Sequence, residues 1–229
     1  IEKYVCPTIV SSDLLGGPAL RYKEDNRTHV AIVVSDDHYR ADVTLPAFAQ
    51  KLRDQCGLYC TVSHGEGEAD IRRLDELKTA DVVIVYVRRL ALPAEQLKII
   101  QSYVEAGKPL VALRTASHAF SVRGKAPPAD RAQWPDFDKD VLGGNYHGHG
   151  PNELGTDVST PADAADHPIV AGVRPASWHS TGSLYNVLPI DPEAKVLLMG
   201  KSGDDVEPLA WTREYRGGRV IYNSLGHWD

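Results

Sequence analysis

The stretch His29-Val30-Ala31-Ile32-Val33-Val34-Ser35 is a nearly continuous apolar run. Runs of this kind are typical of strands that are buried on both faces of a parallel sheet. A second such run spans Asp81 to Val87, and shorter candidates lie at Tyr59 to Ser63 and at Pro109 to Leu113. These four segments predict the core strands of an α/β fold.

Helical patterns lie between the predicted strands. Residues Leu45 to Gln55 carry apolar side chains at helical spacing, with Pro46 expected in the first turn and Gly57 ending the helix. Pro93 opens a second helix, which ends at Gly107. Alternation of strand and helix implies right-handed crossovers. The sequence therefore predicts a doubly wound, mostly parallel open sheet with helices on both sides.

The C-terminal half has a different character. Beyond Ser121 the sequence is rich in Pro, Asp and Gly, and its strand candidates are short, which predicts an irregular, β-rich extension of the sheet; the candidates are 156–159, 195–199, 209–212 and 219–223. No repeat, low-complexity tract or linker divides the chain. We therefore expect a single domain over residues 28–229, preceded by an extended N-terminal arm over residues 1–27.

Charge and composition narrow the partners. The net charge is −6 and the sequence contains no Lys/Arg stripe, which argues against a nucleic-acid partner. The apolar runs are too short to span a membrane, so we expect a soluble protein. The sequence begins at Ile1 rather than Met, which leaves a cytoplasmic and a periplasmic or secreted location open. Its three cysteines include Cys56 and Cys60, between which a disulfide is geometrically possible.

Ligands of open α/β sheets bind beyond the carboxyl ends of the strands, which points to the loops after Ser35, Val87 and Leu113. The turn after Leu113 is similar to a nucleophile elbow, and Arg114 occupies the nucleophile position. A guanidinium stays protonated and cannot attack a carbonyl carbon. This argues against acyl transfer by a cysteine or serine at that position.

A Gly-rich loop places His147 and His149 one residue apart. Two imidazoles at this spacing can bind zinc, or one of them can act as a general base. A zinc site would need a third ligand, for which His118, His227 and Asp37 are candidates. Spacing alone leaves both possibilities open.

Several short motifs in a fixed order carry a family likeness. They cover most of the chain from Thr28 onward and comprise the segments 109–118, 142–149, 166–169, 183–186, 210–220 and 225–227. With these motifs the sequence resembles ThuA-like (trehalose utilisation) proteins. That resemblance implies a flavodoxin-like fold of the class I glutamine amidotransferase-like type, without the catalytic cysteine. Such proteins generally continue into a final helix, whereas this sequence stops at Asp229, so we expect that helix to be missing.

The resemblance also implies which histidines matter. The histidine after the Gly-Gly-aromatic loop corresponds to His149, the one after the last strand to His227, and the one near the elbow to His118. Two differences from the family pattern are visible. Many family members have an acidic residue just before the Leu-Tyr-Asn motif, where this sequence has Gly182-Ser183, and Asp37 is the candidate to replace that carboxylate. Many also have a histidine early in the loop after the first strand, for which His38 is only an approximate equivalent.

The leading hypothesis is an enzyme, without amidotransferase activity and without a cofactor, that acts on a sugar or an oxidised sugar derivative. His118, His149 or His227 would transfer protons, and Arg114 would hold an oxyanion or hydroxyl. The predicted substrate-binding residues are Asp37, His38, Tyr39, Asn145, Tyr146 and Tyr185.

Two alternatives remain open. One is a non-catalytic sugar-binding module with a recess formed by Arg114, Tyr39, Tyr146 and Trp178. The other is a zinc-dependent hydrolase that uses His147 and His149. The expected partner is a small carbohydrate in every sugar-based case, and a homo-oligomer is left open.

Overall fold

The computed structural model describes residues 26–35, 38–66 and 70–226. A ten-stranded sheet runs through it, in the order β10-β9-β12-β13-β14-β6-β4-β1-β2-β3. Its strands are β1 (His29–Ser35), β2 (Tyr59–Glu66), β3 (Asp70–Ile71), β4 (Val82–Val87), β6 (Leu110–Leu113), β9 (Thr156–Ser159), β10 (Ser177–Ser180), β12 (Lys195–Ser202), β13 (Asp205–Tyr215) and β14 (Gly218–Asn223). The predicted arm over residues 1–27 lies almost entirely outside the described residues.

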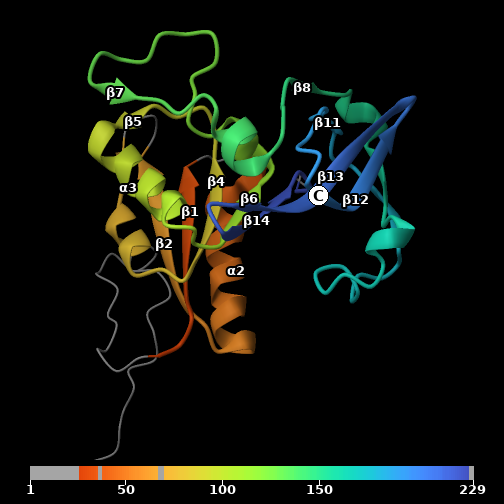
Figure 1. Ribbon diagram of the computed structural model, residues 1–229, viewed down its shortest axis with the longest axis horizontal. Coiled ribbons are helices and arrows are strands. Elements are labelled where there is room, and N and C mark those ends of the chain that lie inside the picture. The colour runs from red at the N-terminus through yellow and green to blue at the C-terminus, as the bar shows by residue number, and fades with distance from the viewer. Residues whose placement is uncertain (1–25, 36–37, 67–69, 227–229) are drawn as a thin grey trace, which may run out of the picture.

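The sheet is mixed. The strands β2, β1, β4, β6 and β14 pair in parallel, and β3 is antiparallel to β2. On the other side of β14, the strands β13, β12, β9 and β10 are all antiparallel to their neighbours. Figure 1 shows these strands extending away from the helices α2 and α3. The α/β prediction is therefore confirmed, while the parallel pairing is confined to one half of the sheet.

Two helices cover opposite faces of the parallel half. Helix α2 (Ala41–Cys56) packs against alternate residues of β1, among them Val30 and Ile32. Helix α3 (Ala94–Glu105) packs through its apolar stripe against the other face, where Ala31 and Val33 lie. All seven residues of β1 are buried, as its continuous apolar run predicts.

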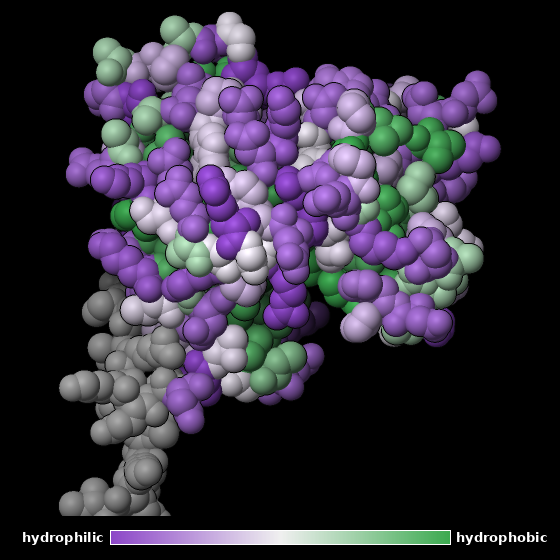
Figure 2. All heavy atoms as spheres, viewed as in Figure 1, coloured by the Kyte–Doolittle hydropathy of each residue, from purple (hydrophilic) through white to green (hydrophobic). Residues whose placement is uncertain are grey.

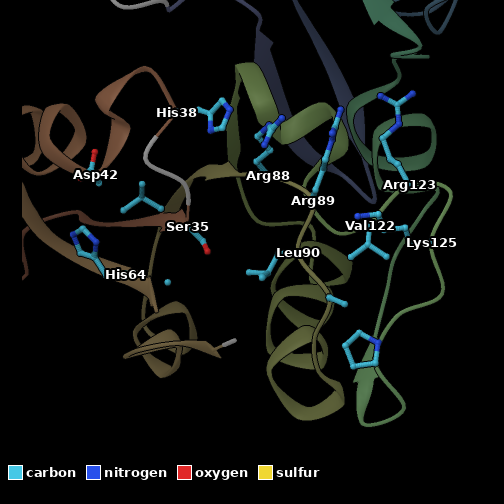
Figure 3. Close-up of a pocket in the computed structure, with 14 residues that line it drawn as sticks. Ser35, His38, Asp42, His64, Arg88, Arg89, Leu90, Val122, Arg123 and Lys125 are labelled. Atoms are coloured by element: carbon cyan, nitrogen blue, oxygen red, sulfur yellow. The ribbon is translucent and has the colours of Figure 1, made fainter. Parts of the chain in front are cut away.

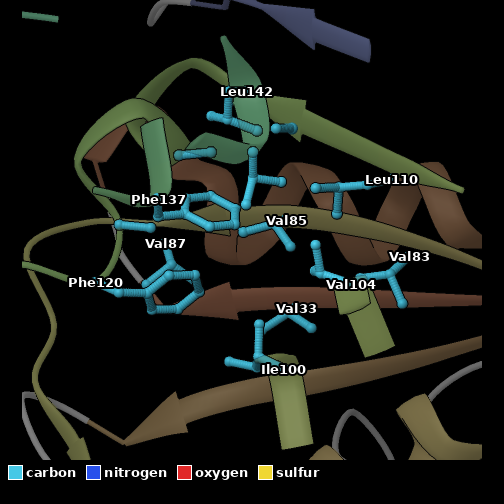
Figure 4. Close-up of a cluster of buried hydrophobic side chains, with 14 of the residues drawn as sticks. Val33, Val83, Val85, Val87, Ile100, Val104, Leu110, Phe120, Phe137 and Leu142 are labelled. Atoms are coloured by element: carbon cyan, nitrogen blue, oxygen red, sulfur yellow. The ribbon is translucent and has the colours of Figure 1, made fainter. Parts of the chain in front are cut away.

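The larger apolar cluster lies on the α3 side (Figure 4). Valines of β1 and β4 pack against Ile100 and Val104 of α3 there. Phe120 and Phe137 belong to the same cluster and contact each other edge to face, with ring centroids 5.0 Å apart. Each such side chain contributes roughly 1.5–3 kcal/mol when it leaves water. This cluster anchors the loops that follow the strands.

Helix α2 begins earlier than predicted. The prediction put Pro46 in the first turn, but the helix starts at Ala41, so Pro46 is interior. The two residues before it, Tyr39 and Arg40, adopt left-handed backbone angles with φ of 57° and 55°. Non-glycine residues rarely adopt this conformation, and the sequence has no glycine at this turn from which it could be predicted.

The remaining elements are short and lie mainly in the loops. Two small sheets pair β5 with β7 and β8 with β11. The segments are η1 (His38–Arg40), η2 (Leu74–Lys78), β5 (Leu92–Pro93), η3 (Arg114–His118), β7 (Arg131–Ala132), the π-helix η4 (Asp138–Leu142), β8 (Gly148–His149), η5 (Asn152–Leu154), η6 (Ala162–Ala164) and β11 (Tyr185–Asn186).

Hydrophilic residues cover most of the face shown in Figure 2. Within the described ranges, no helix combines the length and the apolar character that crossing a membrane requires. Cys56 is exposed and Cys60 is buried, and both are free thiols, so the disulfide considered from the sequence is not formed.

Counted in chain order, the five parallel strands lie in the order 2-1-3-4-5. This order reverses direction between β1 and β4. Open α/β sheets bind ligands in the crevice at such a point, beyond the carboxyl ends of the two strands. The fold therefore directs attention to the residues that follow Ser35 and Val87.

Candidate functional site

Three loops meet at the carboxyl edge of the parallel strands. The segment η1 follows β1, Arg88 and Arg89 follow β4, and η3 follows β6 without a break. Two adjoining cavities lie among these loops, and they share His38, Arg88 and Arg89.

The smaller cavity, here called the recess, has a volume of about 260 Å³. Its walls are aromatic and histidine side chains with two arginines and an amide. They are His38, Tyr39, Arg88, Arg89, His118, Tyr146, His149, Asn152 and Tyr185. Six of these are residues that the sequence predicted as catalytic or substrate-binding.

The larger cavity, here called the groove, has a volume of about 860 Å³ and is shown in Figure 3. Its polar side chains come from the end of β1 and the start of α2, from η1 and β2, and from the loops after β4 and before β7; they are Ser35, His38, Asp42, His64, Arg88, Arg89, Arg123 and Lys125. The sequence pointed to the loop after Val87, which begins with Arg88 and Arg89, but it did not indicate Arg123, Lys125 or His64.

Arg114 lies beneath the recess rather than in its wall. Its side chain is buried, and its guanidinium lies between the rings of Tyr39 and Tyr185, 4.6 and 4.5 Å from their centroids. Nη1 donates to the carbonyl oxygen of Ser224 at 2.6 Å, and Nη2 donates to Ser183 Oγ at 3.3 Å. These contacts make Arg114 a support for the aromatic wall.

The backbone at Arg114 is unusual. Its φ is 38°, in the left-handed region that non-glycine residues seldom occupy. The carbonyl oxygen of Arg114 accepts hydrogen bonds from Tyr222 Oη at 2.9 Å and from Ser117 Oγ at 3.2 Å, which hold the turn in place. The sharp turn expected from the sequence is therefore present, with a guanidinium where a nucleophile would stand.

His118 is almost completely buried and is held in one orientation. Its ring stacks on Tyr146, with centroids 4.6 Å apart and planes 20° apart. Ser117 Oγ donates its only proton to the carbonyl of Arg114, so the 3.2 Å contact between Ser117 Oγ and His118 Nδ1 needs a proton on Nδ1. This arrangement leaves Nε2 as the ring's acceptor.

The surroundings keep His118 uncharged. Burial, helped by the positive charges of Arg89, Arg88, Arg123 and Arg114, lowers the pKa of His118 to about 2. The ring is therefore a neutral imidazole throughout the physiological pH range.

His149 stands at the exposed side of the recess. It lies on β8, which pairs with β11 so that His149 is opposite Tyr185, and the two rings are 6.3 Å apart. Its Nδ1 lies 2.8 Å from the carbonyl oxygen of Gly150, so Nδ1 must carry a proton in that contact. His149 and His118 thus face the same small cavity, one in contact with solvent and one shielded from it.

A buried carboxyl group fixes the Tyr146 loop. Asp138 Oδ2 accepts a hydrogen bond from the backbone N–H of Tyr146 at 2.7 Å. Burial raises the pKa of Asp138 to about 7, although that hydrogen bond opposes the rise. Gly144 lies against this carboxyl group, and a Cβ at Gly144 would approach Asp138 Oδ1 to 2.8 Å. The close approach explains the glycine at that position.

Other predicted residues lie elsewhere. Asn145 is exposed and its amide donates to the carbonyl of Leu188 at 3.1 Å, so it does not line the recess. His147 is exposed and lies 2.8 Å from the carbonyl of Asn145 through Nδ1. Trp178, considered for a sugar-binding recess, packs against the apolar cluster of the antiparallel strands. Asp37 and His227 lie outside the described residues.

The zinc alternative depends on a third donor. In the part of the chain that the structure describes, no three His, Cys, Asp or Glu side chains come together as a metal site. His147 lines neither the recess nor the groove, so its ring does not join His149 at a shared cavity.

Solved structures resemble this fold. A ThuA-like protein from Bacteroides uniformis matches with a TM-score of 0.60 and 20% identity, over 92% of this chain and 86% of that chain. A ThuA-like protein from Parabacteroides merdae matches with a TM-score of 0.56 and 17% identity, over 88% and 80%. A β-galactosidase from Rahnella sp. R3 matches with a TM-score of 0.54 and 16% identity, over 86% of this chain but 28% of that chain.

At these identities the likeness concerns the fold alone. A comparison with curated protein sequences finds no match. A family model described as trehalose utilisation, ThuA, matches residues 29–229, which is nearly the whole of the described chain. The order of motifs noted in the sequence, the fold and this match agree, and the chain belongs to the ThuA family.

Proposed function

We propose that the chain is a carbohydrate-processing enzyme that holds a sugar in the recess and transfers protons through histidine. The observation that carries the proposal is the pairing of a shielded, neutral His118 with a solvent-exposed His149 at one aromatic cavity. The family's description as trehalose utilisation supports a carbohydrate role.

The recess suits a sugar ring for physical reasons. The aromatic side chains that line it, such as Tyr39 and Tyr185, offer apolar surface to the C–H groups of a sugar. Polar groups at the rim, including Asn152 and Arg89, supply directional hydrogen bonds to hydroxyl groups. The volume of about 260 Å³ holds about one sugar unit.

The two histidines would then have different tasks. His118, with Nδ1 engaged by Ser117, offers Nε2 as an acceptor for a sugar hydroxyl or for the proton that the sugar loses. His149 can exchange protons with bulk water because it is exposed, so it would return a proton to the substrate or carry one away. Such a pair serves isomerisation, elimination or hydrolysis.

Arg114 supports this site in the proposal rather than touching the substrate. Its terminal nitrogens already donate to Ser224 and Ser183, and its guanidinium lies between Tyr39 and Tyr185. It therefore orients the aromatic wall. Because Arg114 occupies the nucleophile position, the proposal excludes glutamine amidotransferase activity at the elbow.

One observation favours a second candidate, a non-catalytic sugar-binding module. With a pKa of about 2, His118 is a weak base in the ligand-free chain, and general-base catalysis works best when the pKa lies near the operating pH. A module that only binds sugar needs a hydrogen-bond acceptor and no base.

The matched variants His149→Ala and His147→Ala separate the two candidates. Each histidine is exposed and contacts one backbone carbonyl at 2.8 Å, but only His149 lines the recess. The protein is incubated with glucose, trehalose and oxidised hexoses in D₂O, and proton NMR follows product formation and loss of C–H signals. The enzyme proposal expects turnover by wild type and His147→Ala, and a loss of about 100-fold or more in His149→Ala.

Binding is measured on the same proteins by calorimetry. Binding without any product or deuterium exchange, together with only a weakened affinity in His149→Ala, would establish the binding module instead. Equal turnover in His149→Ala and wild type would contradict the proposed role of His149.

A further inference from the structure

The groove is lined by four basic side chains that make no ion pair among the described residues. Arg88, Arg89, Arg123 and Lys125 line it, and none of the four makes an ion pair with another described residue. His38 and His64 add two more nitrogen-bearing side chains, and among the described residues that line the cavity Asp42 is the one acidic group.

This is unusual for an acidic chain with 31 Asp and Glu residues against 25 Lys and Arg residues. Elsewhere in the described residues, several basic side chains have carboxylate partners. Examples are Arg73 with Glu76, Arg131 with Asp70, Arg213 with Asp191 and Lys195 with Asp163. Among the described residues, the groove therefore gathers four basic side chains that have no carboxylate partner.

The position of the groove points to a ligand. It lies beyond the carboxyl ends of β1 and β4, where the strand order reverses. Ser35, the last residue of β1, lines it and is 9% exposed, and its hydroxyl has no hydrogen-bond partner among the described residues. Buried hydroxyls are usually hydrogen-bonded in folded proteins, so this group is available to a ligand.

The groove is also continuous with the recess. His38, Arg88 and Arg89 line both cavities. The guanidinium of Arg123 lies over the ring of Tyr146, 5.0 Å from its centroid, and the same ring stacks on His118. In Figure 3 the side chains of His38, Arg88, Arg89 and Arg123 lie in one row across the cavity. A ligand in the recess therefore has cations directly beside it.

We propose that the groove binds the anionic group of the sugar that the recess holds, so that the substrate class is an acidic carbohydrate carrying a carboxylate or a phosphate. The inference rests on the proposed function and names its substrate class. Guanidinium groups bind both anions through paired N–H donors, and such charge-assisted hydrogen bonds are about twice as strong as neutral ones. The groove volume of about 860 Å³ accommodates either group with further sugar atoms or water.

The test is isothermal titration of the full chain at low salt with glucose, glucuronate, glucose 6-phosphate and inorganic phosphate. We expect at least one of the two acidic sugars to bind about tenfold or more tightly than glucose, and the preference to fall as salt rises. The two acidic sugars identify the anionic group, because tighter binding of glucuronate indicates a carboxylate and tighter binding of glucose 6-phosphate indicates a phosphate.

The variant Arg88→Gln/Arg123→Gln removes two groove cations, and Arg219→Gln on β14 removes one exposed cation that lines neither cavity. The double variant is expected to lose the preference for the acidic sugar, while Arg219→Gln keeps it. A circular dichroism spectrum of the double variant shows whether it is folded. We expect the double variant to keep the wild-type fold, because Arg88 and Arg123 make no ion pair with another described residue.

Two results would overturn the inference. Either glucose binds as tightly as both acidic sugars, or none of the anions, inorganic phosphate included, binds at millimolar concentration. The first result leaves the proposed enzyme standing as one for neutral sugars. Conversely, binding of an acidic sugar with no turnover contradicts the proposed function and keeps the anion site.

Discussion

The recess and the groove share three residues and yet are built in opposite ways. The recess is interlocked with the fold, since Arg114 lies between Tyr39 and Tyr185 and His118 stacks on Tyr146. The groove is lined by cations that make no ion pairs with other described residues. We therefore expect substitutions of the interlocked side chains in or beneath the recess to lower stability, and substitutions of side chains that line only the groove to change binding and little else.

The largest effect is expected for Arg114→Met. Methionine fills much of the space but cannot donate to the carbonyl of Ser224 or to Ser183, and it removes the charge between the two tyrosine rings. Buried acceptors left without donors are costly, so the free energy of unfolding should fall by about 3 kcal/mol. Urea denaturation measures this change.

The matched groove variant is Arg88→Met, which should change the free energy of unfolding by less than about 0.5 kcal/mol. If Arg114→Met and Arg88→Met cost the same, the two cavities do not differ as the contacts indicate.

An intermediate effect is expected for Asp138→Asn, and it depends on pH. Burial raises the pKa of Asp138 from 3.8 to about 7, so between these values the folded chain holds more protons than the unfolded chain. Stability therefore falls as pH rises through this window, by a few kcal/mol in total. Asparagine keeps an oxygen for the Tyr146 N–H and does not titrate, so its curve should lack this fall.

Thermal unfolding at several pH values compares the two proteins. If the wild-type and Asp138→Asn curves stay parallel between pH 4 and pH 7, Asp138 does not titrate with the raised pKa.

The smallest effect is expected for Lys125→Gln, at the exposed end of the groove. Stability should stay within about 0.5 kcal/mol of wild type. Affinity for inorganic phosphate should fall by about twofold at low salt and not at all at high salt, because exposed charges are screened. Titration at two ionic strengths measures it, and an equal loss at both would indicate a structural role for Lys125.

The sequence predicted the parallel core well because burial on both faces leaves a strong pattern. The run 29–35 has no polar residue except at its ends and forms β1 with the same bounds. The start of α2 was predicted wrongly, because Tyr39 and Arg40 hold left-handed conformations that neither residue type announces. Strands β12, β13 and β14 pair as successive hairpins, but β9 pairs with β12 and β14 with β6 across long stretches of chain, and such non-local pairs leave no local pattern in the sequence.

For the site, the sequence was informative about residues on strand ends and less so about distant loops. His118 and Arg114 follow β6 directly, so the rule for ligand sites in open sheets points to them. Arg123 and Lys125 lie in a long loop whose path depends on tertiary packing, and nothing in their local pattern connects them with Arg88. The neutral state of His118 could not be predicted either, since it depends on burial and on four arginines from three separate segments.

The contacts of Tyr146 with both Arg123 and His118 connect the two cavities, so that anion binding in the groove and protonation of His118 are linked. Three of the arginines that disfavour a proton on His118 also line the groove. An anion bound beside them would offset their field, and linkage requires the reverse as well: a proton on His118 would tighten the hold on the anion by the same factor. Substrate and proton would then be taken up together, and the charge of the ligand itself would help to turn a weak base into an effective one.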